Sequence, residues 1–217
     1  PPPRFISSAA SDVYKRQVNG FCVECGSNDG ITNSSCYTLE KNLNYNVLCI
    51  EANPILAEKS KKIRNKVLNI ALGEDEDTCN FFVCNGDGLS GVIDYLDNKE
   101  LNEKIMNGQP APHYEWGGHN IEIKMKTLKQ ILDENNAPHV IDYVSMDIES
   151  AEYPTLKKFF SEENNSYRVT FFSIEGSMCD SLLRDNGYIK ILNKFNTNAP
   201  YESCLLYTSD AADEMRR

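Results

Sequence analysis

The stretch FCVECGSNDGI, residues 21–31, is the most informative part of the chain, because an apolar run ends there in a turn bounded by glycines. Residues 20–26 have the composition of a short buried strand. Gly26 and Gly30 bracket the turn that follows, and glycine allows both tight backbone geometry and the close approach of a ligand. We therefore expect a strand that runs directly into a ligand-binding turn.

The same stretch contains Cys22 and Cys25, at the spacing of many redox and metal motifs. Successive side chains of a strand point to opposite faces, so two residues an odd number of positions apart face opposite ways. Such a pair cannot bind one ion or form an unstrained disulfide. The other cysteines are scattered, mostly in apolar runs. We interpret all of them as buried free thiols, expect no metal site, and take the many free thiols to favour a reducing, cytoplasmic location.

Outward from this turn, short apolar runs alternate with segments of helical periodicity. Strands are expected at 20–26, 45–53, 66–72, 79–85, 121–127, 140–148, 167–176 and 188–195, and helices at 33–43, 54–64, 128–135, 151–160 and 178–188. Strands that alternate with helices predict parallel βαβ units and an α/β fold. Between the fourth and fifth strands, residues 86–118 are rich in Gly, Asn and Asp and are expected to be irregular.

Composition sets the class of protein. The chain has 217 residues, 41% of them hydrophobic, and a formal net charge of -10. These values suit one soluble α/β domain, and so acidic a surface argues against a nucleic-acid partner. No apolar run approaches the ~20 residues that span a bilayer.

Both ends of the chain differ from the middle. SSAASDVYKRQ (7–17) and LLYTSDAADE (205–214) lack periodicity and resemble translated adapter DNA. We therefore expect residues 1–17 and 205–217 to be non-native-looking or disordered tails, and residues 18–204 to form the domain.

The charges of the turn indicate what it binds. Ligands of open α/β sheets lie beyond the carboxyl ends of the strands. Glu24 and Asp29 would repel a pyrophosphate there, and the second and third glycines of the dinucleotide fingerprint are absent. A cationic cofactor such as S-adenosylmethionine would be attracted. Glu51 ends the second strand, close to the position from which an acid accepts hydrogen bonds from ribose hydroxyls. The alternative is that Glu24 and Glu51 are ordinary charges at strand ends.

Three separated motifs resemble the FkbM family of S-adenosylmethionine-dependent methyltransferases over about residues 18–195. They are FCVECGSNDGITNSSCYTLEKNLNYNVLCIEANP, LSGVIDY and IDYVSMDIESAEYPTLKKF. The resemblance implies a Rossmann-like class I methyltransferase fold for residues 18–204, with a mostly parallel seven-stranded sheet and helices on both faces. It also implies that the turn binds the methionine part of the cofactor and that Glu51 binds the ribose. The implied cofactor-binding residues are Glu24, Gly26, Asn28, Asp29, Gly30 and Glu51.

The resemblance further implies O-methylation of a hydroxyl on a sugar, a glycan or a small natural product, and a base must then remove the hydroxyl proton. Candidate bases are Asp147 at the end of a strand, the neighbouring Glu149, and His119 in the irregular stretch 108–120, which could cover a substrate. Asp147 could equally be an acid that complements a helix dipole, and a lone histidine in a loop is commonly just exposed. Asp147 and Glu149 could also hold a divalent ion, but no third ligand is evident in the sequence, so no metal is expected.

The chain departs from the family pattern at two places. Ser150 stands where the family usually has Gly in its D-x-E-G-x-E segment, and Gly176 and Ser177 follow Glu175 where many members have His or Asn. These departures keep two alternatives open, a binding module of the same fold without catalysis and, less favoured, an NAD-linked oxidoreductase. The oligomeric state and the identity of the acceptor are left open.

Overall fold

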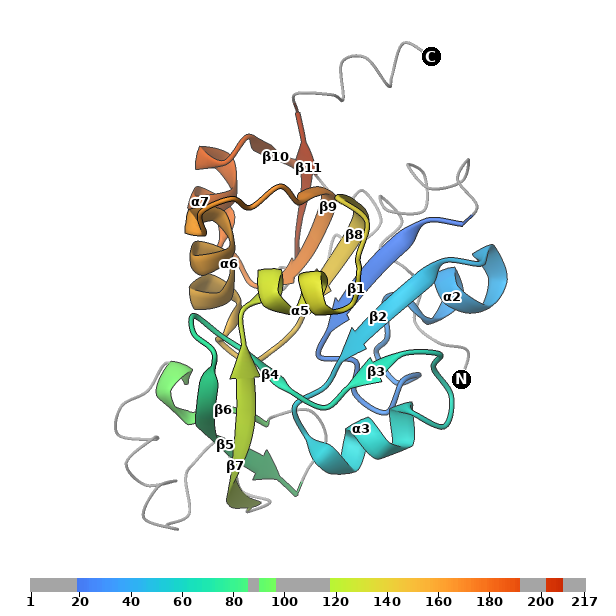
Figure 1. Ribbon diagram of the computed structural model, residues 1–217, viewed down its shortest axis with the longest axis vertical. Helices are drawn as coiled ribbons and strands as arrows, with labels where there is room; N and C mark the ends of the chain where they lie inside the picture. The colour runs from blue at the N-terminus through green and yellow to red at the C-terminus, as the bar shows by residue number, and fades with distance from the viewer. Residues whose placement is uncertain (1–18, 86–89, 97–117, 192–201, 209–217) are drawn as a thin grey trace.

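The computed structural model describes residues 19–85, 90–96, 118–191 and 202–208 (Figure 1). Its strands are β1 (Phe21–Cys25), β2 (Asn46–Ile50), β3 (Val67–Leu68), β4 (Ala71–Leu72), β5 (Asp77–Cys84), β6 (Gly91–Val92), β7 (Gly118–Lys126), β8 (Val140–Met146), β9 (Arg168–Glu175), β10 (Tyr188–Ile191) and β11 (Glu202–Tyr207). Its helices are α2 (Tyr37–Leu43), α3 (Pro54–Ser60), the 3-10 helix η1 (Ile93–Tyr95), α5 (Leu128–Glu134), α6 (Glu152–Ser161) and α7 (Asp180–Asp185). No helix in these ranges is long and apolar enough to cross a membrane.

The larger sheet has seven strands in the order β10-β11-β9-β8-β1-β2-β3. β1 pairs in parallel with both β2 and β8, and β8 pairs in parallel with β9. β11 is antiparallel to β9 and to β10, so the sheet is mixed. The predicted α/β sheet is confirmed, with the qualification that one strand runs against the others.

Helices cover both faces of this sheet, so its central strands are buried on both sides. Val23 and Cys25 pack in the core that α5, α6 and α7 complete, and Cys22 packs in the core beneath α2. The prediction that Cys22 and Cys25 face opposite ways is therefore confirmed. All eight cysteines are buried and free.

A second sheet, β4-β7-β5-β6, was not predicted. The run 66–72, expected as one strand, is divided between the two sheets: β3 pairs with β2, and β4 pairs with β7. Asn69 lies at the division, and its amide donates to the carbonyls of Glu51 and Ala52 at 2.8 and 2.9 Å. Residues 121–127, expected as an edge strand, lie inside the second sheet between β4 and β5. In Figure 1 the arrowheads of β1 and β2 point down toward this smaller sheet.

The carboxyl-terminal boundary needs correction. β10 was expected to close the sheet, but β11 lies between β10 and β9. Leu205 is fully buried in β11, and the ring of Tyr207 lies 5.2 Å from that of Tyr188. Residues 205–207 therefore belong to the sheet, because the β11 position leaves their side chains facing the core. The rest of both predicted tails lies outside the described residues, apart from Thr208.

Two helices begin or end elsewhere than expected. α2 begins at Tyr37, because Asn33 has a φ of 58°, which no helix residue adopts. α3 begins at Pro54 as expected, with Asn53 as its N-cap, but ends at Ser60 instead of Arg64. The chain from Ser60 to Arg64 turns inward, which buries Arg64.

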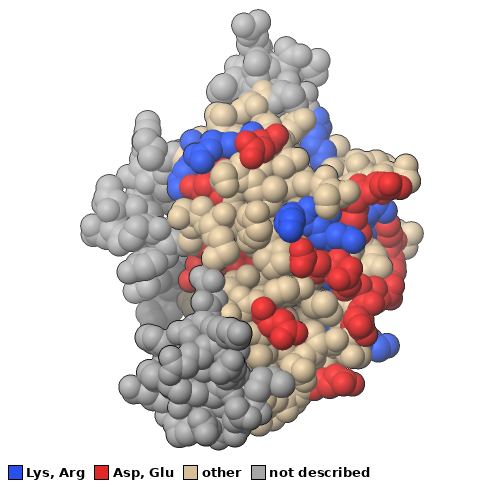
Figure 2. Space-filling view, turned by 90° about the vertical axis from the view of Figure 1, so that its left-hand side faces the viewer, with Lys and Arg blue, Asp and Glu red and all other residues tan. Residues whose placement is uncertain are grey.

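The face of the molecule that carries α6 and α7 mixes acidic and basic side chains (Figure 2). Lys157 and Lys158 on α6 lie 3.9 Å from Glu74 and Asp75 in the turn before β5, and Lys190 lies 2.7 Å from Asp180 on α7. Such exposed pairs contribute little to stability. Among the described residues of this face, acidic and basic side chains are therefore interspersed.

Candidate active site

The glycine turn lies where the carboxyl ends of β1 and β8 meet, and the connections from these strands lead to opposite sides. Gly26 has a φ of 82°, and a Cβ on it would lie 1.8 Å from the carbonyl oxygen of Asp147. Gly30 has a φ of 90°, and a Cβ there would lie 2.8 Å from Ser60 Oγ. Only glycine meets both conditions, so the turn packs closely against the end of β8 and against α3, at the strand ends where open α/β sheets bind their ligands.

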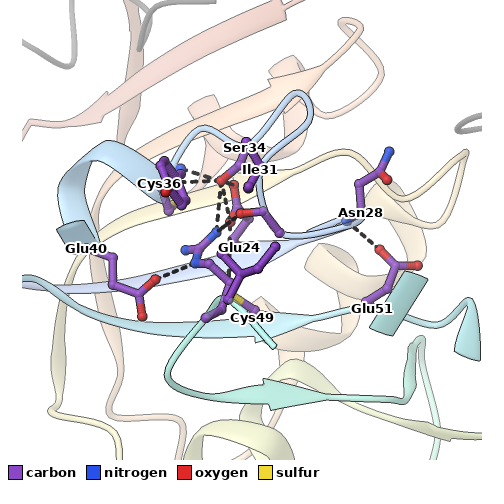
Figure 3. A network of polar contacts seen from close by, with 12 residues as sticks. Glu24, Asn28, Ile31, Ser34, Cys36, Glu40, Cys49 and Glu51 are labelled. Atoms are coloured by element: carbon purple, nitrogen blue, oxygen red, sulfur yellow. Dashed lines mark hydrogen bonds and ion pairs between the residues drawn. The ribbon is translucent and has the colours of Figure 1, made fainter. Parts of the chain in front are cut away.

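Glu51 connects the turn to α3. Its carboxylate accepts the Asn28 N–H at 2.7 Å at one oxygen (Figure 3) and the Asn53 N–H at 2.9 Å at the other. Burial raises the pKa of Glu51 to about 7, although these two hydrogen bonds act to lower it. Each carboxylate oxygen can accept a further hydrogen bond, so the group is already positioned to receive two hydroxyl donors.

Asp29 shapes the turn. Its carboxylate accepts the N–H groups of Ile31 and Thr32 at 2.9 and 2.7 Å and the Thr32 hydroxyl at 2.8 Å. Burial acts to raise the pKa of Asp29, but the hydrogen bonds from Thr32 and Ile31 outweigh it and lower the pKa. Asp29 therefore stays ionised and orders the backbone around the turn.

Glu24 has a role different from the predicted one. Its side chain is 2% exposed and accepts hydrogen bonds from Ser34 Oγ at 2.7 Å, from the Cys36 N–H at 3.0 Å and from Arg64 at 2.8 Å. Figure 3 shows Ser34 and Cys36 directed toward Glu24, with the Asn28–Glu51 hydrogen bond as a separate contact. The interpretation of Glu24 as a cofactor ligand is corrected, because the carboxylate is committed to an internal ion pair.

The sequence analysis missed Arg64 and Glu40, which complete this ion network. Arg64 is 4% exposed, pairs with both Glu24 and Glu40, and donates to the Gly30 carbonyl at 3.1 Å. It thereby ties the end of the glycine turn to β1 and α2. Arg64 follows several exposed lysines, and no local pattern distinguishes it from them.

Three carboxylates meet at the carboxyl ends of β8 and β9. Oxygen atoms of Asp147, Glu149 and Glu175 all lie within 4.8 Å of one another. The register places Met146 opposite Ile174, so Asp147 and Glu175 follow at the same edge. Burial, followed by repulsion from Asp147, raises the pKa of Glu149 to about 8 and that of Glu175 to about 7. These groups can hold a proton near neutral pH, which suits general base catalysis.

Glu175 was not predicted as a site residue, although its position after a strand next to β8 was a usable signal. The expectation of no metal rested partly on the lack of a third ligand beside Asp147 and Glu149. Glu175 supplies that ligand, and hard divalent cations prefer carboxylate oxygens. Exposed acidic groups are also common in proteins without an ion, so we assign no metal to the cluster.

The backbone beside these acids is strained. Glu149 and Ser150 have φ values of 54° and 73°, in the left-handed region that favours glycine. Glu152 stabilises the turn, because its buried carboxylate accepts the Ile148 N–H at 2.6 Å. Ser150 therefore keeps the conformation that glycine adopts readily, which explains why the family usually has glycine at this position.

Replacing Ser150 with glycine should stabilise the protein. A left-handed non-glycine residue costs about 1–2 kcal/mol, so Ser150→Gly is expected to raise the free energy of unfolding by about 1 kcal/mol. Urea denaturation of both proteins measures this difference. Ser161→Gly in α6 is the matched control, and it should destabilise. A loss of stability in Ser150→Gly would show that the turn is not strained.

The LSGVIDY motif connects the second sheet both to the region of Glu51 and to the acid cluster. Ser90 Oγ accepts the Cys84 N–H at 3.0 Å and lies 3.4 Å from the amide of Asn53, next to Glu51. A Cβ on Gly91 would lie 3.2 Å from Glu149 Cβ. Glycine at this position therefore allows the second sheet to pack against the acidic turn.

His119 is not part of the acid cluster. It lies in β7 of the second sheet, opposite Val83, and its side chain is exposed. Its assignment to an irregular segment is corrected, because β5 pairs with β7 as far as Gly118. The rest of the predicted substrate cover, residues 108–117, lies outside the described residues.

Together these features define an α/β protein with a candidate active site at the carboxyl ends of its parallel strands. The family model described as the Methyltransferase FkbM domain matches residues 24–189, and the chain belongs to this family. Among solved structures, the human methyltransferase 10 domain containing protein is similar at 11% identity and a TM-score of 0.42, over 93% of this chain and 79% of that chain. That likeness is too distant to add to the argument. A comparison with curated protein sequences finds no match.

Proposed function

We propose that the chain is an S-adenosylmethionine-dependent O-methyltransferase that acts on a hydroxyl of a sugar, a glycan or a small natural product. Membership of the methyltransferase family supports methyl transfer in general. The observation that carries the cofactor assignment is Glu51, which is held by two backbone N–H groups directly beside the glycine turn. A sheet with one antiparallel strand next to its edge supports a Rossmann-like class I fold.

The residues present suit this cofactor. Gly26 and Gly30 leave the turn without side chains where the backbone approaches a ligand, and Glu51 has acceptor capacity left for the two ribose hydroxyls. Ser27 Oγ is fully buried in the same turn without a hydrogen-bond partner among the described residues, so it is a polar group available to a ligand. When bound, the cofactor would supply a methyl group that a nucleophile can attack.

The protein's own contribution would be alignment and proton transfer. Holding an acceptor hydroxyl at attack distance is the larger effect, since orientation alone can supply about 7–11 kcal/mol of the barrier. Asp147, Glu149 and Glu175 lie at the strand ends next to the glycine turn. The main chain of Asp147 packs so closely against Gly26 that a Cβ would not fit between them. A carboxylate of this cluster would take the hydroxyl proton. No direct contact supports His119 in this role.

The cofactor assignment is tested at Glu51. Glu51→Gln keeps the shape of the side chain but loses its charge, and hydrogen bonds to charged groups are worth about 1.5–3 kcal/mol. Binding of S-adenosylhomocysteine, measured by calorimetry, is expected to weaken by about tenfold or more. Glu122→Gln, at an exposed position on β7, is the control and should bind normally. An unchanged affinity in Glu51→Gln, or tighter binding of NAD to the unaltered protein, would refute the assignment.

The raised pKa of Glu149 predicts how stability changes with pH. Its pKa rises from an ordinary 4.5 to about 8 in the folded protein, so the folded state binds more protons than the unfolded chain between these values. The free energy of unfolding should therefore fall as pH rises through this window. Glu149→Gln cannot ionise and should show a smaller fall in thermal midpoint between about pH 5 and 8. Parallel pH profiles for the two proteins would mean that Glu149 ionises normally.

A further inference from the structure

A hollow lies where the parallel strands of the seven-stranded sheet begin, at the end opposite to the candidate active site. It has a volume of about 510 Å³ and is lined by residues at the starts of β1, β2 and β8, before β3 and after α5. This volume falls in the range of small-molecule sites, roughly 300–1,000 Å³. The five residues of β1 separate it from the acids by roughly 17 Å, so it is distinct from the candidate active site.

The floor of the hollow is tightly packed around Gly20. A Cβ on Gly20 would lie 2.2 Å from the Tyr45 ring and 2.7 Å from Asp142 Oδ2, so only glycine fits there. Asp142 Oδ2 accepts the Phe21 N–H at 2.7 Å, which fixes the carboxylate against the first residue of β1. Gly20, the Tyr45 ring and the Asp142 carboxylate therefore pack tightly against one another at this position.

The rim is polar but carries little net charge. The polar residues of the lining, here called the rim, are four asparagines, one lysine and one aspartate: Asn19, Asn46, Asn65, Asn136, Lys66 and Asp142. The lysine and the aspartate cancel in charge, whereas the whole chain carries -10. Each asparagine amide offers both donors and acceptors of hydrogen bonds.

A small apolar surface completes the lining. Phe21, Pro138 and Val140 contribute to it, and Val140 is 43% exposed at the start of β8. An apolar ligand would leave the surrounding amides unpaired, and an anion would find only one cation. A ligand with many hydroxyl groups and an apolar C–H face matches both parts of the lining.

We propose that this hollow is a binding site for a neutral saccharide, separate from the site of methyl transfer. The amides would pair with hydroxyl groups, which are themselves both donors and acceptors, and the apolar residues would contact a sugar face. Binding here does not depend on the proposed methyltransferase activity.

The test uses the full chain and neutral sugars as probes: glucose, galactose, mannose, N-acetylglucosamine and the disaccharides of each, at millimolar concentration. Saturation-transfer NMR should detect binding of at least one. Amide shift changes should fall at the starts of β1, β2 and β8 and not at the turn of residues 26–30. Shifts confined to the turn or to Asp147 and Glu149 would place the sugar in the acceptor site instead and overturn the proposal.

The double variant Asn46→Ala/Asn65→Ala removes two exposed amides of the rim. Two lost hydrogen bonds of about 1 kcal/mol each should weaken saccharide binding by about tenfold or more. Asn80→Ala, an exposed change on β5 of the second sheet, is the control and should bind normally. S-adenosylhomocysteine binding should be the same in all three proteins, which separates this test from that of the proposed function. Lack of binding by any probe, equal binding by the double variant, or binding of inorganic phosphate in place of sugars would refute the proposal.

Discussion

Arg64→Met is expected to destabilise the protein by about 3–5 kcal/mol, because it leaves two buried carboxylates without their cation. The side chains of Glu24 and Glu40 are 3% and 0% exposed, and both pair with Arg64. Arg64 also donates to the Gly30 carbonyl and to Ser34 Oγ, at 3.1 and 2.9 Å. The substitution should therefore loosen the glycine turn as well as the core beneath α2.

Urea denaturation of the variant measures this loss. Lys62→Met, an exposed change in the same segment, is the matched control and should stay within about 0.5 kcal/mol of the unaltered protein. The triple variant Arg64→Met/Glu24→Gln/Glu40→Gln removes all three charges and should recover part of the loss, because no unpaired charge stays buried. A loss below about 1 kcal/mol in Arg64→Met would show that the ion network is not buried as described.

Gly26→Ala is expected to cost several kcal/mol of stability and to abolish measurable S-adenosylhomocysteine binding. The new Cβ would lie 1.8 Å from the carbonyl oxygen of Asp147, far inside contact distance, and this neighbour is main chain that cannot rotate away. β1 and β8 are paired side by side, so the turn must move and carry the Asn28–Glu51 contact with it. The dihedral angle adds about 1–2 kcal/mol.

Gly176→Ala separates the two causes. Gly176 has a φ of 73°, similar to the 82° of Gly26, but a Cβ there meets nothing within 4 Å. Its loss of stability should therefore be about 1–2 kcal/mol, the dihedral cost alone. Equal losses of stability in the two variants, measured by urea denaturation, would mean that the turn after β1 does not contact the end of β8.

The local features of the candidate site could be predicted from the sequence because each depends on neighbours in the chain. The apolar run before Gly26, the two glycines and the acid that ends the next strand are all readable from spacing and residue type. The opposite orientations of Cys22 and Cys25 follow from strand geometry, and the structure confirms them. Asp147 and Glu149 were identified at a strand end, and the structure places both there, with Glu175 beside them.

Other features depend on contacts between distant segments, for which single-sequence periodicity carries no information. The sequence indicated that Glu24 binds the cofactor, because nothing near it in the chain reveals its partner. The structure pairs it with Arg64, 40 positions away. The run 66–72 is apolar throughout, and nothing in it indicates that its two halves join different sheets. Residues 205–207 were expected to belong to a foreign-looking tail, yet they lie in β11, which pairs between β9 and β10.

The sequence by itself thus determined the α/β class, the glycine turn and the acids at the strand ends, because hydrophobic period and turn chemistry are local. Only the tertiary structure decided how each acid is paired. Glu24 and Glu51 both lie at strand ends and are both buried. Glu24 faces the core beneath α2, where Arg64 neutralises it, and Glu51 lies beyond its strand, where main-chain N–H groups hold it beside the turn. That difference arises from how the chain packs around each carboxylate, which residue type and spacing do not specify.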